Sequence, residues 1–135
     1  WNNFTSNLFF MRDRYAPNQV LTISLTVSVF TVFYLEKILS WCKQNRIHEP
    51  FLNKLSNEPH YRIGVLPKQV RETIKQQWNS SPHWSLRKAT TWLEEDESDL
   101  FLKFKNITRA HDQYRRESFA DTFPELHQAI QQSAS

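Results

Sequence analysis

The chain has 135 residues, which is enough for one modest hydrophobic core and for no more than a single domain. Its single glycine excludes a glycine-rich loop that cradles phosphates, and its single cysteine excludes an internal disulfide and a metal site made of cysteines alone. The net charge of +3 comes from scattered bases and gives only a weak indication of an anionic partner. No secretory signal is recognisable, so we expect a cytoplasmic protein.

The N-terminal part of the chain predicts a helix and then a strand. Residues 2–15 place apolar side chains at helical spacing, and a turn with Pro17 and Asn18 follows. In residues 20–31 apolar and hydroxyl side chains alternate, as in a strand with two different faces. The apolar face holds Leu21, Ile23, Leu25, Val27 and Val29, and the polar face holds Thr22, Ser24, Thr26 and Ser28.

A membrane span is the competing interpretation of this segment, because no charge occurs between Arg14 and Glu36. However, a spanning helix needs about 20 mostly apolar residues, and here a hydroxyl interrupts the apolar run at every second position. We therefore expect no membrane span.

The next segments continue an alternating α/β order. Residues 33–45 predict an amphipathic helix with Cys42 on its apolar stripe, and residues 50–55 predict a second short strand. Residues 56–66 show no period and predict a loop, and Pro67 suits the first position of a helix over residues 68–78. Helix, strand, helix and strand in this order predict a parallel sheet.

From residue 85 onward the pattern is helical throughout. We expect helices over residues 86–94 and 99–117 and a short one that begins at Pro124. The acidic run 94–97 is predicted to be a solvated cap in front of a helix, because acids stabilise a helix N-terminus. The chain thus divides into βα units over residues 1–78 and a helical extension over residues 79–135.

No catalytic motif stands out. The five histidines, His48, His60, His83, His111 and His127, show no metal-ligand spacing, and we expect them on the surface or in loops. No serine lies in a nucleophile elbow, and Cys42 is predicted to be a core residue. We therefore expect no metal site in this chain.

The hydroxyl face of the first strand leaves two interpretations open. It could line the interior of an open parallel barrel that holds a ligand, or it could face solvent. Active sites of such folds gather at the carboxyl ends of strands, here residues 28–31 and the region of Asn53.

A second function class comes from the basic residues interleaved with aromatic ones in residues 101–116. This pattern suits a small basic helical module that contacts nucleic acid or a protein partner by stacking and phosphate pairing. The aromatic side chains fall on one helical stripe and the bases largely outside it, which favours a solvated helix face over a nucleic-acid partner.

Several short motifs follow one another over most of the chain. They are Thr26-Val27-Ser28-Val29, Phe33-Tyr34-Leu35 with Trp41, Asn53, Pro59-His60-Tyr61, Val65-Leu66-Pro67-Lys68, Asp112-Gln113-Tyr114-Arg115 with Phe119, and Phe123-Pro124-Glu125-Leu126. In this order they resemble the twitch-domain or SPASM-like group of radical S-adenosylmethionine enzymes.

The resemblance implies the C-terminal part of a partial (β/α)6 TIM-like barrel followed by a helical extension. Such enzymes use a 4Fe-4S cluster to cleave S-adenosylmethionine reductively and abstract hydrogen from a substrate, here an unknown peptide or small molecule. The cluster requires three cysteines in a Cys-x3-Cys-x2-Cys loop, and this chain has one. We therefore expect a fragment that by itself holds neither the 4Fe-4S cluster nor S-adenosylmethionine and is inactive.

The same resemblance places candidate residues for binding S-adenosylmethionine or substrate. They would position the ligand by hydrogen bonds and not transfer protons. Thr31 departs from the group's pattern, in which asparagine is frequent at this position. The candidate residues are Thr26, Ser28, Thr31 and Asn53.

Overall fold

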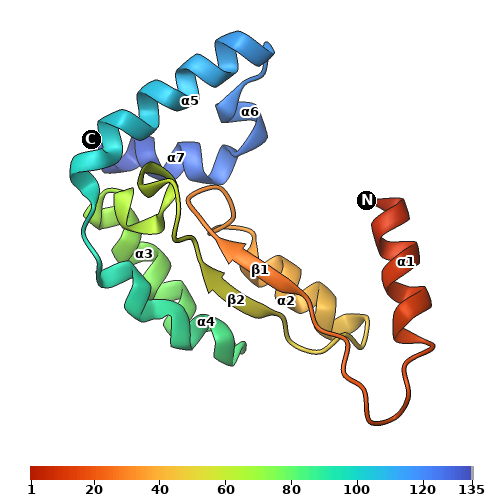
Figure 1. Cartoon of the computed structure of the whole chain (residues 1–135). Helices are drawn as coiled ribbons and strands as arrows, with labels where there is room; N and C mark the ends of the chain where they lie inside the picture. Colours follow the sequence, from red (N-terminus) through yellow and green to blue (C-terminus); the bar gives the residue numbers. More distant parts are fainter. Residues whose placement is uncertain (135) are drawn as a thin grey trace.

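The computed structural model describes residues 1–134 as a helix-rich α/β fold around a two-stranded sheet (Figure 1). The strands are β1 (Ser24–Val27) and β2 (Phe51–Lys54). The helices are α1 (Asn2–Arg12), α2 (Leu35–Gln44), α3 (Lys68–Asn79), α4 (Trp84–Ala89), α5 (Phe101–Arg115), α6 (Phe119–Thr122) and α7 (Pro124–Ser133). Four short 3₁₀ turns join them: η1 (Pro59–Tyr61), η2 (Ile63–Val65), η3 (Thr90–Glu94) and η4 (Ser98–Leu100).

The predicted parallel pairing is confirmed. β1 and β2 run parallel and are connected through α2, which lies behind them in Figure 1. The register places Ser24 opposite Phe51 and Thr26 opposite Asn53. This β1–α2–β2 unit is the part of the fold that positions the candidate site.

β1 is shorter than residues 20–31 because the chain turns directly after it. Beyond Val27, the carbonyl of Ser28 accepts hydrogen bonds from the N–H groups of Thr31 and Val32, which bend the backbone out of the strand. Before the start of β1, a side chain takes the place of a backbone hydrogen bond between the two segments: Thr22 Oγ1 donates to the carbonyl of Glu49 over 3.4 Å. Alternation of side chains continues beyond the hydrogen-bonded strand and so overstates its length.

The two main amphipathic helices form where the spacing predicts them. α2 buries Leu35, Leu39 and Cys42, so the predicted core position of Cys42 is confirmed. α3 follows Pro67 directly, as predicted, and buries the apolar side chains of Val70, Ile74 and Trp78. Burial of apolar side chains along one stripe is what stabilises such helices in a protein.

The segment 56–66 is more ordered than a loop. It contains η1 and η2, and η2 buries Ile63, Gly64 and Val65. Tyr61 accepts a hydrogen bond at its carbonyl from the N–H of Val29 over 2.9 Å, which fixes the segment against the end of β1. Apolar residues without a regular period can therefore still be core residues.

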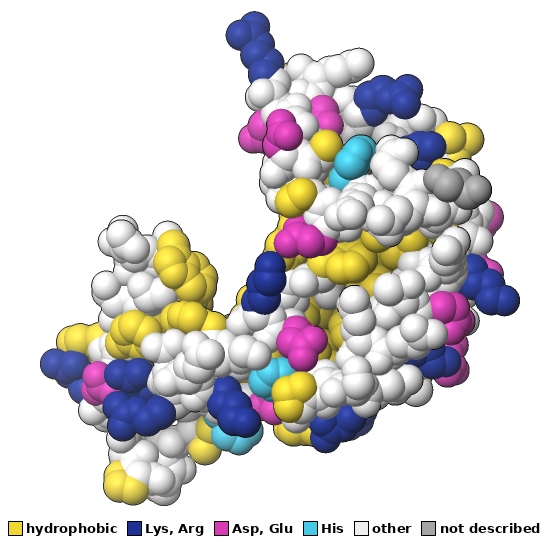
Figure 2. Space-filling view, turned by 180° about the vertical axis from the view of Figure 1, so that it is seen from behind, with side chains coloured by type: hydrophobic (Ala, Val, Ile, Leu, Met, Phe, Trp, Pro, Cys, Tyr) yellow, Lys and Arg dark blue, Asp and Glu magenta, His cyan; other side chains and the backbone are white. Residues whose placement is uncertain are grey.

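The apolar side chains form two separate clusters. The larger one joins β1, α2, α3, α4, α5 and α7. The smaller one contains Leu8 of α1 with Cys42 and Ile47. α1 lies at one end of the molecule and contacts α2 through this smaller cluster (Figure 1). Figure 2 shows hydrophobic side chains at the surface of this end.

The C-terminal half is helical, as predicted, but its segments are shorter. Residues 86–94 divide into α4 and η3, and the predicted helix over residues 99–117 begins as η4 and ends at Arg115. Arg116 adopts a left-handed conformation with φ of 55°, which ends α5. α6 and α7 then turn the chain back beside α5 (Figure 1).

Candidate functional site at the carboxyl end of the strands

Two of the predicted site residues lie opposite each other on an open face of the sheet. Thr26 and Asn53 are register partners, and both are exposed. Asn53 Nδ2 donates a hydrogen bond to Ser24 Oγ, which is also exposed on this face. Phe51, 62% exposed, completes the face beside Ser24. We call Ser24, Thr26, Phe51 and Asn53 the open face.

The open face follows from the sequence alternation. In a strand, successive side chains point to opposite sides, so the apolar residues of β1 turn toward α2 and the hydroxyl residues turn away. Leu25 and Val27 accordingly pack into the main core, while Ser24 and Thr26 stay exposed. The open face can donate and accept hydrogen bonds but has no group that titrates near neutral pH.

The other two predicted site residues hold the turn after β1. Thr31 Oγ1 accepts a hydrogen bond from the N–H of Ser28 over 3.0 Å and donates one to the carbonyl of Thr26 over 2.9 Å. Ser28 is buried, whereas Thr31 is partly exposed. Their hydroxyl groups thus shape the carboxyl end of β1, next to the open face.

Ion pairs fix the neighbouring carboxyl end of β2. Lys54, the last residue of β2, pairs with Glu95. Arg62 pairs with Glu97 over 2.9 Å, and it also donates to the carbonyl of Ser56. These contacts bind the segment after β2 to the acidic run 94–97.

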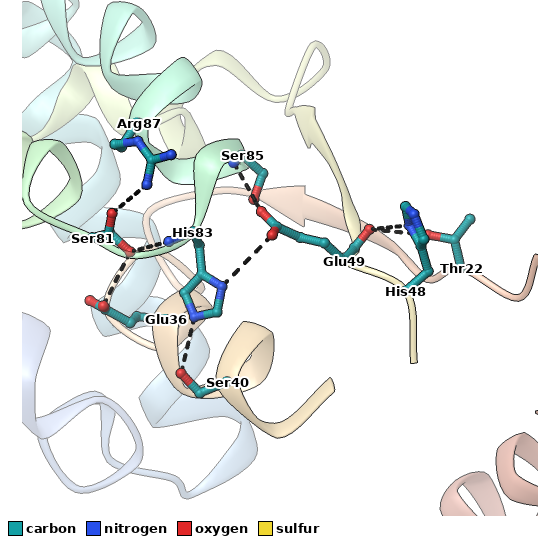
Figure 3. A network of polar contacts seen from close by, with 9 residues as sticks. All are labelled: Thr22, Glu36, Ser40, His48, Glu49, Ser81, His83, Ser85 and Arg87. Carbon is teal, nitrogen blue, oxygen red and sulfur yellow. Dashed lines mark hydrogen bonds and ion pairs between the residues drawn. The ribbon is translucent and has the colours of Figure 1, made fainter. Parts of the chain in front are cut away.

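A polar network on the opposite side of the fold was missed from the sequence. Figure 3 shows His83 between Ser40 of α2 and Glu49, which precedes β2. His83 Nε2 lies 3.1 Å from Ser40 Oγ, and its Nδ1 lies 3.9 Å from Glu49 Oε2. His83 lies in a loop, as expected, but only 4% of it is exposed.

The serine, histidine and carboxylate of this network do not form a nucleophilic triad. The 3.9 Å separation of His83 and Glu49 exceeds a hydrogen bond, and Ser40 lies inside α2, where backbone N–H groups serve the helix. The carboxylate of Glu49 instead accepts hydrogen bonds from the N–H and hydroxyl of Ser85. The network joins α2, the start of β2 and α4.

The sequence carried only a weak signal for this network. Polar residues between two helices usually indicate an exposed turn. Burial of His83 and Ser81 depends on how α4 docks against α2, which spacing along the chain does not reveal.

Residues 1–134 contain no set of ligands for an iron-sulfur cluster. No group of three or more histidine, cysteine or acidic side chains in this range could hold a metal ion. Cys42 is buried beside α1, and burial raises the pKa of its thiol. A neutral thiol is a poor metal ligand, since the thiolate is the ligating form. The residues present therefore do not fit a 4Fe-4S cluster.

Comparison with known proteins gives no match to a family model, a curated protein or a solved structure. Across residues 1–134, no helix combines the length and the apolar character needed to cross a membrane.

Proposed function

We propose that this chain is the C-terminal part of a cytoplasmic radical S-adenosylmethionine enzyme. Residues 1–78 would supply βα units of its partial (β/α)6 barrel, and residues 79–135 its helical extension. The observation that carries the proposal is the parallel β1–α2–β2 unit with the open face, which is uncharged and polar except for Phe51, on the side away from α2. In such a barrel this face would line the interior.

The chain's own residues would position a ligand. Thr26 and Asn53 offer a hydroxyl and an amide at adjacent positions, which suits hydrogen bonds to the polar groups of S-adenosylmethionine or of a peptide or small-molecule substrate. Ser28 and Thr31 would set the position of the strand end by the hydrogen bonds within the turn. None of these side chains is a proton donor or acceptor suited to acid-base catalysis.

The cluster would have to be held outside these 135 residues, because Cys42 is the single cysteine and is buried. We assign no step of radical formation to this chain. Its contribution is to bind and orient, and the chain by itself is proposed to be inactive.

The test is to express the reading frame that contains these residues together with the coding sequence upstream of them. We expect that sequence to encode a Cys-x3-Cys-x2-Cys loop, and the anaerobically reconstituted product to form 5′-deoxyadenosine from S-adenosylmethionine. An upstream sequence without the cysteine loop, or a reconstituted product that forms no 5′-deoxyadenosine, would overturn the proposal.

A matched pair of variants tests the open face in that longer protein. Asn53→Leu should keep the cluster absorbance but weaken binding of S-adenosylmethionine or substrate by about tenfold, since a hydrogen-bonding amide is lost. Asn57→Leu, at an exposed position outside the open face, should bind as the unmodified protein does.

The alternative, a basic binding module on α5, is supported less well. Phe104, one of its stacking candidates, is buried, and Phe101 packs against the main core. Only an exposed aromatic ring can stack on a base, so Tyr114, 89% exposed, is the one stacking candidate of the three that stays available. Lys103 and Lys105 remain exposed, as on an ordinary solvated helix face.

A further inference from the structure

A cavity lies between the strand ends and the helical extension. Its volume is about 390 Å³, within the range of small-molecule sites. Phe30 follows β1, Tyr61 follows β2, and the remaining lining residues come from α5, α6 and the segments next to α6. None of the four candidate residues for binding S-adenosylmethionine or substrate lines this cavity.

The floor of the cavity is a packed group of aromatic rings. The Phe30 ring centroid lies 5.1 Å from that of Tyr61 and 5.0 Å from that of Phe123. The Phe119 centroid lies 5.7 Å from that of Phe123. Rings this close together fill the space between them, so they form a surface on which another ring can stack, not a cage around a cation.

The polar part of the lining carries charges of both signs. Arg115 and Glu117 form no ion pair with any residue in 1–134, although other arginines of the chain, such as Arg62 and Arg71, are paired. Asp112 uses one carboxylate oxygen, Oδ2, to accept the N–H of Phe119 over 2.9 Å. The cavity therefore presents a free guanidinium and free carboxylate oxygens beside an apolar floor.

One further observation indicates that a polar group of the cavity lacks a partner. Thr108 lines it, and its Oγ1 is buried without a hydrogen bond within the described chain. Buried polar atoms normally have a partner. Tyr61 and Arg115 line the same cavity; burial raises the pKa of Tyr61, and the positive charge of Arg115 opposes that rise.

From this arrangement we infer that the cavity binds a free aromatic α-amino acid. The ring would stack on Phe30, Phe119 and Phe123, the carboxylate would pair with Arg115, and the ammonium group would pair with Glu117 or Asp112. A ligand with a single charge would pair with the cavity groups of opposite sign but would lie beside the unpaired groups of its own sign. Arg115 and the carboxylates therefore each need a partner. A zwitterion satisfies both.

Calorimetric titration of the 135-residue protein tests the inference. L-Phenylalanine should bind saturably, and three analogues that each lack one feature should bind about tenfold more weakly. They are L-phenylalaninamide without the carboxylate, 3-phenylpropionate without the ammonium group and L-alanine without the ring. A peptide amide with an N-terminal phenylalanine retains ring and ammonium, and equal affinity for it would overturn the pairing with Arg115.

Variants assign the contacts. Arg115→Gln should weaken L-phenylalanine by about tenfold or more and leave L-phenylalaninamide unchanged. Lys103→Gln, an exposed lysine of α5 outside the cavity lining, should leave both unchanged. Circular dichroism checks that each variant folds. No saturable binding of L-phenylalanine below about 10 mM, or an equal effect of both variants, would overturn the inference.

Discussion

Gly64 is the chain's single glycine, and the neighbouring acidic run leaves no room for a side chain at this position. It is buried in η2, and its φ is not positive, so the restriction is steric. A Cβ at this position would lie 2.8 Å from the carbonyl oxygen of Glu95 and 3.0 Å from Glu97 Oε2. The closer contact is with backbone, which a change of rotamer cannot relieve.

Gly64→Ala should therefore lower the free energy of unfolding by about 1–3 kcal/mol, because the acidic run must move away. Urea unfolding followed by circular dichroism measures this. Gln76→Ala, at an exposed position of α3, should change the midpoint little. An unchanged midpoint for Gly64→Ala would show that the acidic run moves without cost.

Arg71 is a buried charge that binds backbone as well as an acid. It donates to the carbonyls of Leu66, Leu93 and Glu95 over 2.9 to 3.0 Å, and it pairs with Asp96. Only 5% of Arg71 is exposed, so these carbonyls would lose their partner if the guanidinium were removed.

Arg71→Met should lower the free energy of unfolding by about 2–4 kcal/mol, since methionine fills part of the space but leaves the carbonyls unpaired. Arg109→Met, at an exposed position of α5, is the matched control and should change stability by less than about 0.5 kcal/mol. Equal effects of the two variants in urea unfolding would contradict the role of the buried hydrogen bonds.

At the scale of elements, the acidic run 94–97 has a different role from the one predicted. Each acid pairs with a base from another part of the chain, rather than only capping a helix. Exposed pairs stabilise a protein little one by one, but here four of them join the segment to β2, α3 and the region around η2. The pairs are Lys75–Glu94, Lys54–Glu95, Arg71–Asp96 and Arg62–Glu97.

The contact between α2 and α7 gives the protein a pH dependence at high pH. Tyr34, at the start of α2, donates to Glu125 of α7 over 2.7 Å. Burial, and then this hydrogen bond, raise the pKa of Tyr34 to about 12 from 10. The folded state thus favours the neutral phenol, so this contribution to stability is complete below pH 10 and is lost as the pH rises toward 12.

Tyr34→Phe should lower the free energy of unfolding at neutral pH by about 1 kcal/mol, because one hydrogen bond is lost. It should also reduce the loss of stability between pH 10 and pH 12. Tyr114→Phe is the control, because Tyr114 is 89% exposed and lies outside the α2–α7 contact. Urea unfolding at a series of pH values measures both effects, and identical pH profiles of the two variants would contradict this role of Tyr34.

Local spacing could predict elements, but not what ends them or how they dock. α2 and α3 were predicted within a few residues, since an apolar stripe at helical spacing is a local signal. β1 was predicted too long, because the turn at Ser28 depends on the Thr31 side chain. η2 was taken for a loop, because its buried residues meet partners distant in sequence.

For the candidate site, too, local spacing predicted some features and could not predict others. The alternation in β1 predicted that Thr26 would lie on the polar face, and the register then places Asn53 beside it. The sequence could not show that Thr31 is used within its own turn. It also gave no sign of the aromatic cavity, whose lining residues extend from Phe30 to Phe123.

For the whole molecule, the separation into two apolar clusters is the main feature of its stability. α1 contacts the remainder through the smaller cluster, where the Phe9 and Trp1 rings pack on Trp41 at centroid distances of 5.9 and 5.4 Å. Outside this contact, Trp1 is 74% and Phe10 57% exposed. α1 therefore buries only part of its apolar surface.

A helix held by a small cluster should open without unfolding the main core. Leu8, 7% exposed, is the buried residue of α1, and Leu8→Ala removes its packing against Cys42 and Ile47. The lost packing should lower the free energy needed for α1 to open locally by about 2 kcal/mol. Amide hydrogen exchange should then become faster in α1 and stay unchanged in α3.

Leu86→Ala is the matched substitution in the main core, where Leu86 is fully buried. It should destabilise the protein globally by about 2–5 kcal/mol and accelerate exchange in α3 as well as in α2. Because the two leucines belong to different clusters, their effects should be additive in the double variant. If Leu8→Ala accelerated exchange in α3 as much as in α1, the two clusters would have to unfold as one unit.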